Sequence, residues 1–333
     1  MNQNIKFCTA TDGVSIAYAS IGTGPPFVKA ANWMNHLEHD ATSPVWRHVI
    51  DEFSRDHEFI RYDERGTGLS DRTVEGLSLD AFVGDLEAVV DARGLDRFPL
   101  FAISQGGAVA ISYAVKHPAK VSHLIMLGAF ATGWNKSGLS PELLAQRHAE
   151  VTLIRQGWGS RNPASRQFWT TLCLPDGRPD ESLSFNEMQR ASASPEHAAR
   201  IFEAIGDFDV SDLLPTLDLP VLVMHAREDA TVPFEEGRKL ASAIPNARFV
   251  PLESRNHLLM HHEAAWPRFV HEVRKFLGRE TPEDAVSTPT RLLKTCPTCS
   301  RTYADEAMLY CLDDGSKLIH AGSMDEAPTV LLS

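Results

Sequence analysis

The sequence lacks three features that would place it in a specialised class of protein. No apolar run is long enough to span a bilayer, and the N-terminus, Met1 to Cys8, has no apolar core of signal-peptide length. The five cysteines do not form a disulfide framework, because Cys8 and Cys173 stand alone and the other three lie near the C-terminus. Lysine and arginine do not cluster, and 44 acidic against 32 basic residues give a net charge of −12. We therefore expect a cytoplasmic protein with no membrane partner and, because phosphate contacts supply most nucleic-acid affinity, no nucleic-acid partner.

Strand-like and helix-like segments alternate along most of the 333 residues. Helical spacing of apolar residues is clear in residues 78–94, a helix that Ser78 can cap and Gly94 can end. Segments typical of strands lie at residues 16–19, 27–31, 58–62, 98–103, 121–127, 220–225 and 248–252, and of these 98–103 and 121–127 indicate buried strands. This alternation predicts an α/β fold with a mostly parallel sheet and helices on both faces.

The alternation stops between residues 131 and 212, where strand signals are absent and aromatic residues stand among helical segments. We interpret this region as a helical cap over the carboxyl edge of the sheet, where α/β proteins bind ligands. The core is then predicted to consist of residues 1–130 and 213–279. A simpler interpretation is that the aromatic residues only attach the cap to the core. They are Trp134, Trp158, Phe168, Trp169 and Phe185.

Ser104 follows the apolar segment 98–103 and precedes Gly106, Gly107 and a stretch with helical spacing. A serine in such a sharp strand-to-helix turn projects its hydroxyl above the sheet, and small neighbours allow strand and helix to approach closely. The backbone N–H groups at the start of the helix then face the place where an anion would develop. The pattern indicates a nucleophile, with Ala102 in place of the usual first glycine. Taken alone, the segment also fits a serine that only caps a helix.

A serine nucleophile needs a base to remove its proton and a carboxylate to orient that base. Asp229 and His257 lie in loops after two later predicted strands, and both loops would leave the same edge of the sheet as Ser104. His261 and His262 are nearby alternatives to His257, but only His257 directly follows a predicted strand. We therefore predict the set Ser104, Asp229 and His257.

The order Ser104, Asp229, His257 resembles that of the α/β-hydrolase superfamily, and the resemblance covers residues 1–279. The family register Asp-x-x-Val-Pro selects Asp229 rather than its neighbour Glu228. The run from Asn32 to His39 is similar to a bacterial branch that is often fused to adenylate cyclase or to transcription-regulator modules. The resemblance implies the α/β-hydrolase fold and a Ser-His-Asp triad. A further motif of the family reads Asp63-x-Arg65-Gly66-x-Gly68-x-Ser70.

The turn after the first central strand departs from the family pattern. Related enzymes usually carry His-Gly there, whereas this chain has Asn32 and Trp33. The resemblance implies the backbone N–H groups of Gln105 and Trp33 as the donors that bind the oxyanion. Because losing one such donor lowers rates on the order of 10²–10³, the altered turn is compatible with low activity even where the triad is intact.

These residues predict a serine hydrolase that acts on carboxylic esters and needs no cofactor for catalysis. Lactones, and C–C bonds of β-diketone type, remain open as substrates of the same machinery. A serine nucleophile argues against a haloalkane dehalogenase, which needs a carboxylate at that place. A regulatory ligand-binding module with weak or no turnover is the alternative from a different class. The fusion branch, the altered turn and the C-terminal appendage favour that alternative.

The C-terminal part has a different composition. Residues 280–293 are polar, contain proline and are predicted to form a linker. Within residues 294–320, Cys296 and Cys299 form a Cys-x-x-Cys turn, and Cys311 with Asp314 would complete a structural zinc site. The pattern resembles small bacterial zinc ribbons. The alternatives are a redox pair or a metal-free ribbon that packs on the hydrolase.

Residues 321–333 are predicted to form a flexible tail. Thr329 follows a proline in an acidic context, which motivates the hypothesis that phosphorylated Thr329 binds a phosphothreonine-reading domain. A simpler interpretation is a frayed terminus, and a phosphopeptide that does not bind such a domain would contradict the hypothesis. The ribbon and this tail are the two predicted sites for a protein partner.

Overall fold

The computed structural model describes residues 3–160, 162–279, 294–299, 302–303, 310–311 and 315–320. The chain separates into two compact units, Met1–Glu280 and Thr281–Ser333. The predicted linker 280–293, the predicted tail 321–333 with Thr329, and the predicted ligand Asp314 lie outside the described residues. Among the helices described, none is long and apolar enough to cross a membrane.

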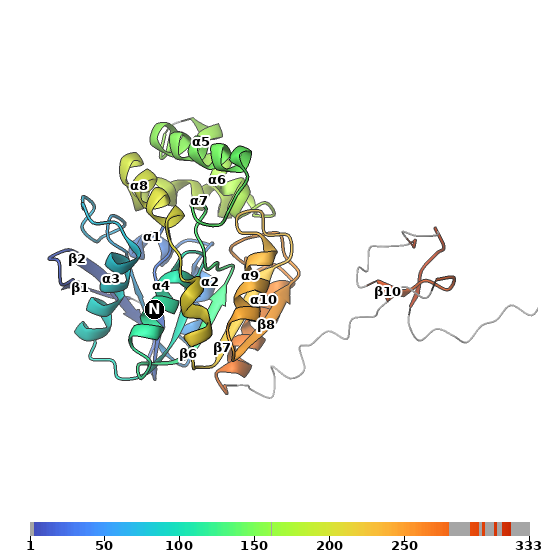
Figure 1. The fold of residues 1–333 in the computed structure, drawn as a ribbon, viewed down its shortest axis with the longest axis horizontal. Helices are drawn as coiled ribbons and strands as arrows, with labels where there is room; N and C mark the ends of the chain where they lie inside the picture. The colour runs from blue at the N-terminus through green and yellow to red at the C-terminus, as the bar shows by residue number, and fades with distance from the viewer. Residues whose placement is uncertain are drawn as a thin grey trace, which may run out of the picture. The chain divides into compact units, whose positions relative to one another are not determined.

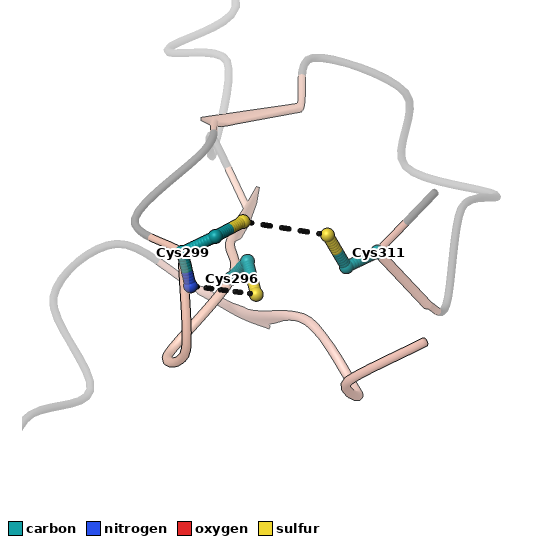
Figure 2. Close-up of side chains that lie close together, drawn as sticks. All are labelled: Cys296, Cys299 and Cys311. Atoms are coloured by element: carbon teal, nitrogen blue, oxygen red, sulfur yellow. Dashed lines mark hydrogen bonds between the residues drawn. The ribbon is translucent and has the colours of Figure 1, made fainter. Parts of the chain in front are cut away.

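The described residues of the second unit include a small antiparallel sheet. Its strands are β10 (Thr302–Tyr303), β9 (Lys294–Thr295) and β11 (Ile319–His320), with β9 in the middle. Figure 2 shows Cys296 and Cys299 close to Cys311 beside this sheet. The buried apolar cluster described for this unit consists of Cys296, Cys311 and Leu318. A cluster of this size supplies little hydrophobic stabilisation.

The first unit is built on an eight-stranded sheet with the order β1-β2-β4-β3-β5-β6-β7-β8 (Figure 1). β1 pairs antiparallel with β2, and β2 with β4, whereas every pair from β4–β3 to β7–β8 is parallel. The predicted α/β fold with a mostly parallel sheet is therefore confirmed. The strands are β1 (Asn4–Thr9), β2 (Ser15–Ile21), β3 (Pro26–Lys29), β4 (Glu58–Tyr62), β5 (Phe98–Ile103), β6 (Val121–Leu127), β7 (Val221–Ala226) and β8 (Ala247–Leu252).

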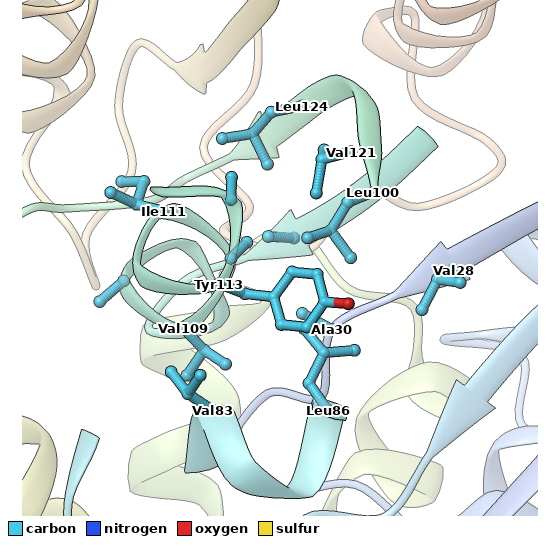
Figure 3. Packing of buried hydrophobic residues seen from close by; sticks show 14 of the residues in the cluster. Val28, Ala30, Val83, Leu86, Leu100, Val109, Ile111, Tyr113, Val121 and Leu124 are labelled. Carbon is cyan, nitrogen blue, oxygen red and sulfur yellow. The ribbon is translucent and has the colours of Figure 1, made fainter. Parts of the chain in front are cut away.

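Alternate side chains of the central strands point to opposite faces of the sheet and form two hydrophobic clusters. Leu100 of β5 belongs to the first cluster and Phe101 to the second. Figure 3 shows part of the first cluster, with Tyr113 and Leu86 beside the sheet. Helices therefore cover both faces, as predicted. The first cluster includes residues of α3 (Leu79–Ala92), α4 (Gly106–Lys116) and α9 (Phe234–Ala243), and the second includes residues of α2 (Arg47–Phe53) and α10 (Ala265–Phe276).

Among the described residues, four α-helices lie between β6 and β7 in the chain: α5 (Pro141–Gly157), α6 (Pro163–Cys173), α7 (Pro179–Ser192) and α8 (Pro195–Gly206). Each begins with proline, whose fixed φ and missing N–H suit the first helical position. The side chains of Ser140, Asn162 and Ser194 cap three of the helices. α5 packs against α8, and α6 packs against α7. In Figure 1 the four helices lie together at the top of the first unit.

The motif from Asp63 to Ser70, which directly follows β4, connects the loops at the carboxyl end of this strand. Arg65 is buried, and its guanidinium lies 2.7 Å from the carboxylate of buried Asp85 in α3. Asp63 accepts hydrogen bonds from the backbone N–H groups of Leu37, at 3.0 Å, and Leu69, at 2.8 Å. Leu37 opens the short helix α1 (Leu37–Asp40). The motif therefore ties α1, the β4 loop and α3 together, which is a structural role.

Candidate active site

Ser104 lies in the turn between β5 and α4, where the sequence predicts it. Its φ of 55° is in the left-handed region, and within the described part of the chain only one other non-glycine residue, Met34, shares it. Such a conformation is uncommon and persists where the surrounding structure enforces it. The Ser104 N–H donates to the carbonyl of Leu127 at 3.1 Å, and the Ser104 carbonyl accepts from the Gly107 N–H at 3.0 Å. Hydrogen bonds on both sides therefore hold the turn.

The loop after β3 passes directly against the start of α4. A Cβ at Gly106 would lie 2.7 Å from the carbonyl oxygen of Ala31, so this approach requires glycine. The contact brings the loop that carries Trp33 to the turn that carries Ser104 and Gln105, and all three residues line one cavity. Within the described residues, the backbone N–H groups of Gln105 and Trp33 donate to no other protein group. Both N–H groups are available to an external acceptor.

The side chains of His257 and Asp229 contact each other directly, with His257 Nδ1 2.7 Å from Asp229 Oδ2. Asp229 Oδ1 accepts hydrogen bonds from the N–H groups of Thr231 and Val232, both at 2.9 Å. Burial works to raise the pKa of Asp229, but the charge and hydrogen bond of His257 and the Val232 N–H outweigh it and lower that pKa. An ionised Asp229 assigns the proton of His257 to Nδ1, which leaves Nε2 to accept a proton.

Helix α6 supports both loops of this pair. The backbone N–H of His257 donates to the carbonyl of Cys173 at 2.9 Å. The hydroxyl of Thr231 donates to the carbonyl of Leu172, also at 2.9 Å. Leu172 and Cys173 are the last two residues of α6, whose carbonyl groups have no partner within the helix. The end of an inserted helix thus anchors the loops that carry Asp229 and His257.

The neighbouring alternatives to this pair lie elsewhere. The side chain of Glu228 is 74% exposed and lies 3.7 Å from that of Arg255. His261 and His262 are both exposed, and His262 contacts Glu181 at 3.1 Å. Of these candidates, only Asp229 and His257 contact each other, and His257 lines the cavity.

Ser104 and His257 line one cavity with a volume of about 310 Å³. Trp33 packs edge-on against Trp169, with ring centroids 5.0 Å apart, and lies 5.2 Å from Phe202. The polar part of the wall includes Glu150 of α5, which is buried and pairs with Arg147 at 2.8 Å. The cavity therefore suits a ligand that is mainly apolar. Its apolar wall includes Trp33, Trp134, Trp169, Phe185, Met188 and Phe202.

Three buried titratable residues near Ser104 and Asp229 are absent from the sequence prediction: Lys29, Glu64 and His225. His225 Nε2 lies 2.9 Å from the Val232 carbonyl and 3.6 Å from Asp229 Oδ2. Burial lowers the pKa of Lys29 to about 8 and raises the pKa of Glu64 to about 8. Of these three residues, only Lys29 could have been singled out from the sequence, because it is a cation at the end of the otherwise apolar strand β3.

In the second unit, the Sγ atoms of Cys296, Cys299 and Cys311 lie within 4.8 Å of one another (Figure 2). Cys299 Sγ is 3.5 Å from Cys311 Sγ, and the N–H groups of Thr298 and Cys299 each lie 3.4 Å from Cys296 Sγ. Thiolates bound to one zinc ion with Zn–S distances near 2.3 Å stand about 3.8 Å apart. The spacing therefore fits three ligands of one zinc ion.

Two sequence relatives resemble the chain over most of its length. The AB hydrolase superfamily protein YisY of Bacillus subtilis is 28% identical over 252 residues, which are 73% of this chain and 89% of that protein. The non-heme chloroperoxidase CPO-A1 of Kitasatospora aureofaciens is 28% identical over 286 residues, which are 83% of this chain and 100% of that protein.

A solved structure and a family model agree with these relatives. The crystal structure of an esterase from Rhodococcus sp. matches with a TM-score of 0.67 and 25% identity, and the match covers 82% of this chain and 98% of that one. The model of the alpha/beta hydrolase fold family matches residues 41–264, from α2 to the loop before α10. The chain therefore belongs to the α/β-hydrolase family.

Proposed function

We propose that this protein is a serine esterase, which hydrolyses carboxylic esters through an acyl-enzyme on Ser104. His257 removes the hydroxyl proton through Nε2 as the oxygen attacks the ester carbonyl, and Asp229 stabilises the imidazolium. The backbone N–H groups of Gln105 and Trp33 bind the oxyanion. The alcohol leaves with the proton from His257, and a water molecule deprotonated by His257 then releases the acid and restores Ser104.

One observation supports the proposal above the others: the strained Ser104 turn and the His257–Asp229 pair are found at one mainly apolar cavity. A serine that only capped a helix would need neither a histidine held by a carboxylate nor a cavity beside it. We infer that α5–α8 act as a cap that shapes the acyl pocket, since residues of all four helices line that cavity. The apolar wall favours an apolar acyl group.

A panel of esters tests this proposal. We expect kcat/KM to rise from acetyl to hexanoyl esters, by about fourfold for each buried CH₂, since each contributes about 0.8 kcal/mol. Steady-state kinetics on p-nitrophenyl esters of increasing length, with lactones and β-diketones in parallel, measure this directly. Turnover of lactones or diketones without turnover of any ester would contradict the esterase assignment and favour one of the two alternative substrate classes.

We also infer that the second unit holds a structural zinc ion through Cys296, Cys299 and Cys311. The convergence of three sulfur atoms supports this inference, and thiolate is a preferred zinc ligand. Zinc would supply the stability that the small apolar cluster of this unit lacks. It would have no part in the chemistry at Ser104.

Removing one of these ligands is expected to remove the metal. Native mass spectrometry of the full chain, purified with reductant and zinc, should find one zinc ion per chain, and Cys299→Ser should lose it. The ester kinetics of the variant should match wild type. Cys8→Ser, which removes a thiol of β1 in the first unit, serves as the matched control and should keep the metal. A wild-type chain that carries no zinc under these conditions would refute the site.

A further inference from the structure

A buried polar contact lies beside the oxyanion donors and has no part in the proposed mechanism. Glu64 follows β4 and Gln105 follows β5, and only β3 separates these two strands in the sheet. Both side chains are buried, and Gln105 Nε2 donates to Glu64 Oε2 at 3.5 Å. Glu64 Oε1 has no hydrogen-bond partner among the described residues. The carboxyl of Glu64 is therefore held against the residue whose backbone N–H is a proposed oxyanion donor.

The second donor has a buried support of its own. Lys29 Nζ donates to Asn32 Oδ1 and, at 3.3 Å, to the carbonyl of Ala30. It also lies 4.9 Å from the centre of the Trp46 ring. Asn32 directly precedes Trp33, so Lys29 holds one oxyanion turn while Glu64 contacts the other.

We propose that Glu64 is a positioning residue of the oxyanion site, which it supports when its carboxyl is neutral and weakens when its carboxyl is ionised. The proposal rests on the esterase function proposed above. A neutral carboxyl accepts the hydrogen bond from the Gln105 side chain and adds no charge near the backbone N–H groups that bind the oxyanion. An ionised carboxyl keeps the contact but puts a negative charge, poorly screened in the protein interior, close to the oxyanion.

The groups around Glu64 set the pH at which this change occurs. Burial is the largest influence, and together with Asp85 of α3 and Asp63 of the same loop it raises the pKa of Glu64 to about 8. Lys29 of β3 and the hydrogen bond from Gln105 act in the opposite direction. The carboxyl is therefore neutral below about pH 8 and ionised above it, so its negative charge destabilises the oxyanion as the pH rises.

The rate of fluorophosphonate labelling at Ser104, measured from pH 6 to pH 10, tests the proposal. The phosphonyl oxygen occupies the oxyanion site as the adduct forms, and the readout needs no assumption about the substrate. In wild type we expect the rate to fall on the order of tenfold above pH 8, equivalent to about 1.4 kcal/mol in the barrier. In Glu64→Gln, which keeps the shape but cannot ionise, the rate should stay level. Any change in rate below pH 8 should be common to both proteins.

The labelling experiment distinguishes a failure of the Glu64 proposal from a failure of the esterase function. A Glu64→Gln variant with the same fall as wild type overturns the proposal and leaves the esterase function intact. A folded wild-type chain that is not labelled at Ser104 overturns both. Glu52→Gln is the matched control, because Glu52 is a buried carboxylate on α2 that pairs with Arg274 at 2.6 Å. Its pH profile should equal that of wild type.

Lys29→Met provides a second variant that does not depend on the folding of Glu64→Gln. Removing the cation takes away an influence that lowers the pKa of Glu64. The fall in labelling rate should therefore move to higher pH if Glu64 causes it. A fall that disappears in Lys29→Met would assign the titration to Lys29 and overturn the proposal for Glu64.

Discussion

Replacing Ser104 with alanine is expected to abolish labelling by a fluorophosphonate probe and to lower esterase kcat on the order of 10⁴–10⁶. Wild type should take up one adduct, located at Ser104 by peptide mapping, because the proposed mechanism activates this hydroxyl alone, through His257 and the two backbone donors. Alanine removes the oxygen proposed to attack and keeps the backbone N–H groups proposed to bind the carbonyl. Substrate affinity should therefore change little while turnover is lost.

Intact-mass spectrometry measures the adduct, and circular dichroism checks that the variant is folded. Ser242→Ala is a suitable control, since Ser242 is an exposed residue of α9 whose hydroxyl donates to the Lys239 carbonyl. It should label as wild type does. Folded wild type that takes up no adduct would contradict the esterase mechanism and would favour a ligand-binding module.

Asp229→Asn is expected to lower kcat by about 10⁴ with little change in structure. Oδ1 of this side chain accepts two backbone N–H groups, from Thr231 and Val232. In the variant, the amide oxygen must stay there, so the amide NH₂ faces His257 Nδ1. His257 then carries its proton on Nε2 and cannot take one from Ser104. The loss therefore comes from the wrong tautomer, and KM should be nearly unchanged.

Glu228→Gln supplies the control for this experiment. It makes the same chemical change at the preceding residue, whose side chain is 74% exposed and lies 3.7 Å from that of Arg255. Steady-state kinetics on one ester should find this variant equal to wild type. A loss of activity in Glu228→Gln with full activity in Asp229→Asn would show that the acid has been assigned to the wrong residue.

The parallel part of the sheet could be predicted because strands buried on both faces must be apolar throughout, as β5 is. β1 could not be predicted in this way. It is an edge strand with largely exposed side chains, and Phe7, its most prominent apolar residue, is 59% exposed. The individual helices of the insertion were not predicted either, although the pairs Ser140-Pro141 and Ser194-Pro195 are recognisable as helix starts.

The candidate site also contains features that the sequence predicts and features that it does not. Ser104, Asp229 and His257 could be singled out because each follows a strand, and loops after parallel strands meet at one edge of the sheet. Their roles as a triad remain a prediction. The contact between Glu64 and Gln105 could not be foreseen, because it depends on how the loops of β3, β4 and β5 pack together. No local pattern in the sequence encodes that packing.

The anchoring of two loops by the end of α6 has an evolutionary consequence. Inserted helices in α/β proteins are natural candidates for exchange by recombination, because they enter and leave the core at two points. Here an exchange of residues 141–206 would also remove the carbonyls of Leu172 and Cys173, which accept hydrogen bonds from Thr231 and His257. New substrate preferences are therefore more readily reached by point changes on α5, α7 and α8, which line the cavity and leave the support of His257 in place.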